Sequence, residues 1–128
     1  MPNRPALVHL LAAVTQEVSN WDGINLKPHA RGGTEFAFGQ GEIGHLHLDG
    51  TLDVPFPLAV RDELIASGHA RPHHWLPKSG WVSWEIGSAE DVPVALRLLR
   101  RSYEWRLQAK QAAAQRKQHV ESVTGSRR

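Results

Sequence analysis

Residues 42–57, EIGHLHLDGTLDVPFP, decide the fold because they indicate two short strands joined by a tight turn. Apolar and polar side chains alternate through the first half of this stretch, which is typical of a strand with one buried face. Leu46 and Leu48 are expected on one face, so His45 and His47 share the other. The pairing of the two strands therefore determines what the histidines contact.

The length of the turn sets that pairing. A three-residue loop at 49–51 would pair His47 with Asp53. A three-residue loop at 48–50 would instead pair His45 with Asp53. A two-residue Asp-Gly loop, which the local signal favours, would mix apolar and polar side chains on both faces, and burial of one face selects against that. We therefore predict a three-residue loop, with Asp53 on the histidine face.

Helical and strand patterns alternate on both sides of this hairpin. Helices are expected over about 5–19, over about ten residues from Pro57 and from Asp91 onwards; strands are expected over 34–38, 42–48, 51–54 and 81–86, with a short extended piece near 24–26 and an extended or irregular segment over 69–77. Asp91 is expected to cap the last helix. The order predicts an α+β fold: a single, mainly antiparallel sheet of about five strands with helices packed on one face, and a long C-terminal helix.

Charge divides the chain into two parts. Of the 15 Lys and Arg side chains, residues 100–128 hold eight beside only two acidic ones, so residues 1–99 hold seven basic against eleven acidic side chains. We expect a single domain over 1–107 and a basic tail over 108–128 that is helical or disordered. The body lacks the basic patch of a nucleic-acid-binding domain, so nucleic acid is not an expected partner.

Composition also bears on location. The chain has no cysteine, which excludes disulfides and thiolate metal sites and fits a reducing compartment. No apolar run approaches the roughly 20 residues of a membrane span, and the N-terminal run is too short for a signal peptide. We expect a cytoplasmic protein with no membrane contact, whereas the sequence leaves the oligomeric state open.

The paired histidines have two interpretations. A carboxylate beside an imidazole fixes its tautomer and raises its basicity, which suits a general base or a metal ligand. The other interpretation is an ordinary polar sheet face lined by histidine and aspartate. For His45, His47 and Asp53 alone, the pattern does not decide between them.

A second cluster lies in HARPHHWLPKSGW, residues 69–81. His73 and His74 sit there beside Arg71, Trp75 and Trp81. One interpretation is a surface loop held by tryptophan packing. If this segment meets the first across the sheet, the two would form a pocket of imidazoles walled by aromatic rings.

The stretches GEIGHLHLDGTLDVPFPLAVRDEL and ARPHHWLPKSGWVSWEIGSAEDVPVALRLLRRSYE resemble the luciferase-domain family, small bacterial proteins grouped with the fungal luciferases. The resemblance runs from about Gly33 to Tyr103. Its most specific parts are the E-I-G-H-x-H run, a histidine in the RPHH segment, the strand that begins at Trp81, and the closing Ser102-Tyr103. The fungal proteins are longer and carry an N-terminal membrane anchor that has no expected counterpart here.

The resemblance implies an enzyme, because fungal luciferases oxidise a hydroxylated styrylpyrone with O2. It implies an oxygenase that acts on a small electron-rich aromatic or enolic substrate, with O2 as co-substrate. Site residues are expected in two groups: catalytic His45, His47, His73 and Asp53, and substrate-binding Glu42, Arg71, His74, Trp75 and Trp81. The place of Asp53 in this set rests on the strand register, because the fungal pattern differs there. His45 or His47 would remove a proton from the substrate. In a variant of this hypothesis a divalent metal is the cofactor, held by His45, His47 and His73 together with Asp53 or Glu42, as in two-histidine, one-carboxylate sites.

A second hypothesis is a non-catalytic domain that binds a small ligand or a partner. The element order is also similar, more remotely, to MmcQ/YjbR-like domains, a fold often linked with binding rather than catalysis. Fold alone does not carry function, so the substrate is not transferred from the resemblance.

Overall fold

The computed structural model describes residues 4–125. Three helices and six strands follow in the order α1 (Arg4–Ser19), β1 (Ile24–Pro28), β2 (Thr34–Phe38), β3 (Gly41–Leu46), β4 (Thr51–Pro55), α2 (Leu58–Ala66), β5 (Arg71–Pro72), β6 (Trp81–Glu85) and α3 (Asp91–Gly125). The strands form one sheet in the order β1-β2-β3-β4-β6-β5, and every neighbouring pair is antiparallel. The α+β class is therefore confirmed, with β5 as a two-residue addition to the strands expected.

The β3–β4 hairpin lies at the centre of this sheet and has the predicted odd loop. His45 pairs with Asp53 and Leu46 with Leu52, so the loop is 48–50. The His47 amide donates to the Thr51 carbonyl at 2.8 Å, which closes the loop. The sequence left two registers open. The structure has the one that pairs Leu46 with Leu52 on the buried face and His45 with Asp53 on the other face.

Leu48 departs from the prediction. The expected strand over 42–48 ends at Leu46, and Leu48 lies in the turn with 74% of its surface exposed. The three-residue loop causes this difference, because it removes Leu48 from the alternation that buries Leu46. His47 keeps its place on the histidine face because it still pairs with Thr51 across the start of the loop.

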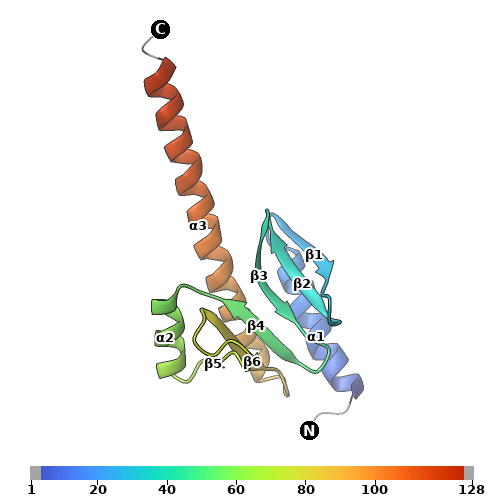
Figure 1. Ribbon diagram of the computed structural model, residues 1–128. Coiled ribbons are helices and arrows are strands. Elements are labelled where there is room, and N and C mark those ends of the chain that lie inside the picture. The colour runs from blue at the N-terminus through green and yellow to red at the C-terminus, as the bar shows by residue number, and fades with distance from the viewer. Residues whose placement is uncertain (1–3, 126–128) are drawn as a thin grey trace.

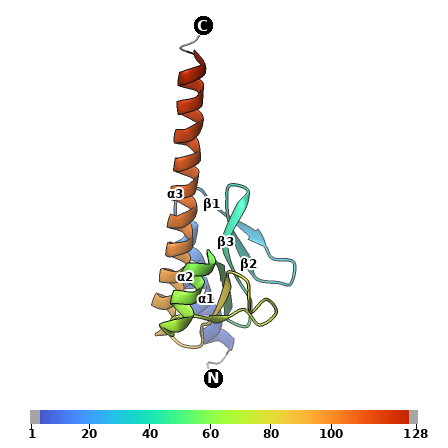
Figure 2. The same cartoon turned by 60° about the vertical axis from the view of Figure 1, so that its left-hand side comes forward.

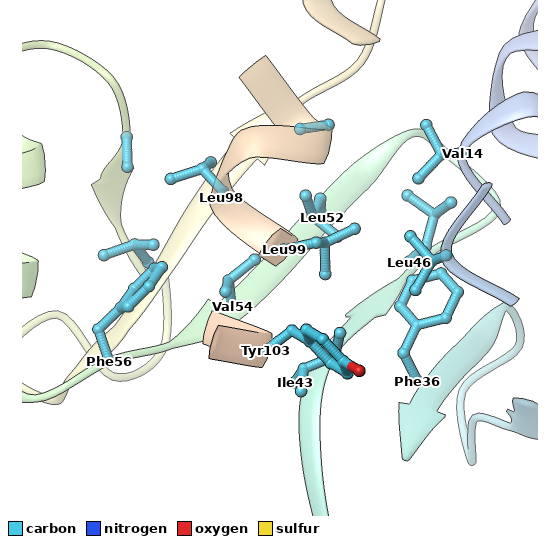
Figure 3. Close-up of a cluster of buried hydrophobic side chains, with 14 of the residues drawn as sticks. Val14, Phe36, Ile43, Leu46, Leu52, Val54, Phe56, Leu98, Leu99 and Tyr103 are labelled. Carbon is cyan, nitrogen blue, oxygen red and sulfur yellow. The ribbon is translucent and has the colours of Figure 1, made fainter. Parts of the chain in front are cut away.

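The helices cover one face of the sheet and leave the other face open (Figures 1 and 2). Buried side chains of the sheet meet those of α1 and α3 between these layers; among them are Val14, Phe36, Ile43, Leu46, Leu52, Val54, Leu98, Leu99 and Tyr103 (Figure 3). Gly44 allows β3 to pack closely, because a Cβ there would lie 2.7 Å from Leu99 Cδ2 on α3 and 2.9 Å from the Asp53 carbonyl oxygen on β4. This packing fixes the position of β4, and Asp53 on β4 faces the opposite side.

Helix α3 begins at Asp91 as predicted, but the Asp91 side chain does not have the capping role expected of it. Asp91 is its first residue, and its carboxylate accepts hydrogen bonds from the preceding Gly87 and Ser88 amides at 2.8 and 2.9 Å. It therefore ties the β6–α3 loop to the helix instead of capping the helix amides that follow. The hydrogen bond from the Gly87 amide is the main reason that the pKa of Asp91 lies below its usual value.

Helix α3 continues to Gly125 and extends away from the sheet (Figure 1). Tyr103 is its last fully packed residue, and Leu107 is partly buried against the core. The division into a domain over 1–107 and a tail over 108–128 stays a prediction, and residues 126–128 lie outside the described part. Within residues 4–125, no helix carries an apolar run of the length that a lipid bilayer requires.

Candidate functional site

Asp53 is the centre of a polar cluster on the open face of the sheet. Its side chain is only 1% exposed, although it is ionisable. One carboxylate oxygen, Oδ2, lies 3.1 Å from His45 Nε2, 2.8 Å from His47 Nε2 and 3.5 Å from His73 Nε2. Three imidazoles thus converge on one buried oxygen, and they come from β3, from the hairpin loop and from the segment after β5.

The other partners of the cluster hold these groups in place. Ser83 is the cross-strand neighbour of Asp53 on β6, and its hydroxyl donates to Asp53 Oδ1 at 2.6 Å. Glu42 Oε2 accepts from His45 Nδ1 at 3.1 Å. Both nitrogens of His45 therefore point at carboxylates, and both oxygens of Asp53 are engaged.

The tautomer of His73 follows from its backbone contacts. Its Nδ1 lies 3.2 Å from the amide nitrogens of both Trp75 and Leu76, and these amides donate to it. An Nδ1 that accepts carries no proton, so the proton of a neutral ring sits on Nε2. Nε2 faces Asp53 Oδ2, so His73 is a donor toward the carboxylate.

Aromatic rings pack around the cluster. His29 stacks on His45 with ring centroids 4.3 Å apart, and Trp81 packs against the same ring with centroids 5.1 Å apart. His73 stacks on His74, which contacts Trp75 with centroids 4.6 Å apart. The two sequence clusters therefore lie against each other, which is the condition under which a shared pocket was expected.

A cavity of about 540 Å³ opens over the cluster. Its lining combines imidazoles, one tryptophan and a few loop residues: His29, Arg31, His45, His47, Leu48, Asp49, Thr51, Asp53, His73, His74 and Trp75. The Arg31 guanidinium lies over the Trp75 ring, 3.9 Å from its centroid. Loop residues before β2 and after β5 thus form one wall together.

The cluster perturbs its own pKa values. Burial alone would lower the pKa of His45, but hydrogen bonds to Asp53 and Glu42 outweigh it and raise this pKa to about 9. Burial would likewise raise the pKa of Asp53, but hydrogen bonds from His45, Ser83 and His47 hold it well below its usual range. Burial lowers the pKa of His73, against the opposing attraction of Asp53. In the absence of a metal ion, His45 is therefore an imidazolium beside an ionised Asp53 at neutral pH, while His73 is neutral.

These charges bear on the general base expected at position 45 or 47. An imidazolium has no lone pair with which to accept a substrate proton, so His45 does not fit that role at neutral pH without a metal. The His47 ring has Asp53 as its one hydrogen-bond partner within residues 4–123. Of the two candidates, only His47 has a ring nitrogen that contacts no carboxylate within the described residues.

The structure distributes the remaining predicted residues unevenly. His74 and Trp75 line the cavity, whereas Glu42 and Trp81 support the imidazoles from behind without lining it. Arg71 turns to an ion pair with Glu85 and is not part of this cavity.

Six further residues at the site were not predicted as site residues from the sequence: His29, Arg31, Leu48, Asp49, Thr51 and Ser83. Ser83 could have been found from the pairing of β4 with β6. His29 and Arg31 carry no local signal, because they lie in the loop between β1 and β2 far from either histidine motif.

Comparison with known proteins finds a family model that matches part of this chain. Residues 40–102 match the family model described as Luciferase domain, and this segment contains every predicted site residue. No curated protein and no solved structure gives a significant match to the chain.

Proposed function

We propose that this chain, which belongs to the luciferase-domain family over residues 40–102, binds a small electron-rich aromatic or enolic molecule and promotes its reaction with O2. The observation that carries the proposal is the cavity above Asp53, where five imidazoles and one tryptophan face the same space. Perturbed titratable groups in a concave site are typical of functional sites. The predicted cytoplasmic location remains part of this proposal.

The wall of the cavity suits a flat ring. Trp75 lines the cavity and is 61% exposed, so its ring is accessible to a ligand there. His74 packs on one part of it and Arg31 lies over its face. An aromatic ligand could stack along this wall, and the cavity volume is within the range of drug-sized ligand sites.

One positive charge at the site is available to an anion. The Arg31 guanidinium lines the cavity and forms no ion pair within residues 4–123, whereas the protonated His45 is already paired with the carboxylates of Asp53 and Glu42. A phenolate or enolate would be stabilised there relative to its neutral form. Such an anion can give two electrons to O2 as a carbon–oxygen bond forms. If both oxygen atoms stay in the product, the reaction needs no external reductant.

Oxygen consumption tests this proposal. Purified protein would be given hydroxylated styrylpyrones and simpler polyphenols, with O2 uptake, light and product mass recorded. We expect one O2 consumed per product and both atoms of ¹⁸O2 in that product. The His45→Ala/His47→Ala protein should lose this activity.

Matched controls separate the cavity from the rest of the surface. Trp75→Ala should raise the substrate KM by about tenfold, because the stacking of a nucleic-acid base, a comparable flat ring, on an aromatic side chain contributes about 1–3 kcal/mol. Trp105→Ala on α3 should leave KM unchanged. Equal effects of the two substitutions would contradict the assigned wall. Substrate binding, seen as tryptophan quenching without any O2 uptake, would support the non-catalytic binding domain instead.

A further inference from the structure

The atoms that converge at Asp53 have the spacing of a coordination sphere. First-row divalent metals bind histidine nitrogen and carboxylate oxygen at about 2.0–2.2 Å, so neighbouring ligand atoms lie about 3.0–3.5 Å apart. Asp53 Oδ2 lies 3.1 Å from His45 Nε2 and 2.8 Å from His47 Nε2. All three ligand atoms lie within 4.8 Å of one another. A small outward movement of the side chains would admit an ion between them.

We infer that His45 Nε2, His47 Nε2 and Asp53 Oδ2 form a binding site for one divalent first-row transition metal ion. Two histidines and one carboxylate on one face leave coordination positions open, an arrangement typical of iron(II) sites that react with O2. All three residues line the cavity, so the open positions face the space where a ligand would bind. A bound ion of this class would supply positive charge that lowers the pKa of a phenol or enol held in the cavity.

The hydrogen bonds with Glu42 and Ser83 engage the outer atoms of two ligand side chains and leave His45 Nε2 and Asp53 Oδ2 available to a metal. Glu42 accepts from His45 Nδ1, so a neutral His45 keeps its proton there and presents the Nε2 lone pair. Ser83 donates to Asp53 Oδ1 and leaves Oδ2 for the metal. Because ligand histidines must be neutral, an ion here replaces the proton that His45 shares with Asp53.

His73 is excluded from the ligand set by its tautomer. Its Nδ1 accepts from the Trp75 and Leu76 amides, so its proton sits on Nε2 and no lone pair points at the site. We therefore revise the set expected from the sequence, which joined His45 and His47 with His73. His73 instead donates toward Asp53 and positions the carboxylate.

Cobalt binding tests the site without any substrate. Full-length protein would be treated with a chelator, dialysed and titrated with Co²⁺, with visible absorption and elemental analysis as readouts. We expect one Co²⁺ per chain in the wild type. His47→Ala should weaken binding by more than the roughly 10–100-fold that follows loss of a group that only orients a ligand. Glu42→Gln should fall within that range.

Two histidine variants serve as controls. His74→Ala removes an exposed imidazole from the same cavity and should leave the stoichiometry and affinity unchanged. His73→Gln should still bind one Co²⁺. Thermal unfolding would verify that each variant folds, and His47, whose side chain is 21% exposed, is a safer substitution than buried Asp53.

Three results would overturn the inference: no stoichiometric Co²⁺ binding by the wild type, binding by His47→Ala as tight as that of the wild type, or loss of binding in His73→Gln as complete as in His47→Ala. The outcome is independent of the proposed function, because no substrate is present. Cobalt binding without O2 uptake would keep the metal site and remove the oxygenase. Oxygen uptake that survives chelation, in a protein that binds no metal, would keep the oxygenase and remove the metal site.

Discussion

Asp53 is held by a serine as well as by histidines, and this contact is testable at the scale of one residue. Ser83→Ala removes the 2.6 Å hydrogen bond to Asp53 Oδ1 inside the protein. Loss of a donor to a buried charge should lower the free energy of unfolding by about 1–3 kcal/mol. Urea denaturation measures it, and Ser19→Ala, which removes an exposed serine near the end of α1, is the control. Equal losses in the two variants would contradict a special role for Ser83.

Single residues also show which contacts of the site could be predicted from the sequence. The contact between His45 and Asp53 was predictable, because burial of the leucine face allowed only registers that put the carboxylate with the histidines. The place of His29 against His45 was not, because it depends on the path of the β1–β2 loop. The tautomer of His73 was equally hidden, because backbone amides of its own loop determine it.

At the scale of elements, the packing of α3 on β3 depends on a missing side chain. Gly44→Ala would place a methyl group 2.7 Å from Leu99 Cδ2 on α3 and 2.9 Å from the Asp53 carbonyl oxygen on β4, which is backbone and cannot move aside alone. We expect a loss of about 1–3 kcal/mol in stability, as for other overpacked cores. Thermal or urea unfolding checks this against Gly87→Ala, where the new methyl group would lie at an ordinary 3.7 Å from Asp91 Oδ2. Unchanged stability in Gly44→Ala would mean that the two elements are less tightly packed.

The start of α3 should be sensitive to pH. The pKa of Asp91 lies below its usual value of 3.8, so its ionised form stabilises the fold above that value, and this contribution is lost as pH falls through the folded pKa. Asp91→Ala should therefore cost about 1 kcal/mol at pH 7.

Below the folded pKa, the difference in unfolding free energy between Asp91→Ala and the wild type should shrink toward zero. Glu90→Ala, an exposed neighbour, should show no such pattern. A penalty for Asp91→Ala that stays constant with pH would indicate a packing effect instead of the charge.

Element boundaries show a second limit of the sequence. The helices and the central strands were predicted because each has its own period and its own end signals, such as Pro57 before α2. Leu48 was misplaced because a strand's alternation does not reveal where pairing stops. The two residues of β5 were not predicted as a strand, because only their pairing with β6 makes them one.

At the scale of the whole molecule, the long end of α3 tests whether the chain is one folding unit with an appendage. Apart from Ala112, residues 111–123 are exposed, so they bury little surface against the sheet. Removing residues 112–128 should change the unfolding free energy by less than about 0.5 kcal/mol and leave Co²⁺ binding intact. Urea unfolding and the cobalt titration would measure both in the truncated protein. A large loss of stability would show that the helix end has a structural partner, for which a second copy of the chain is the first candidate, and sedimentation of the full-length protein would then reveal an oligomer. Stability and metal binding that both survive would place the fold and the site together within the first 111 residues.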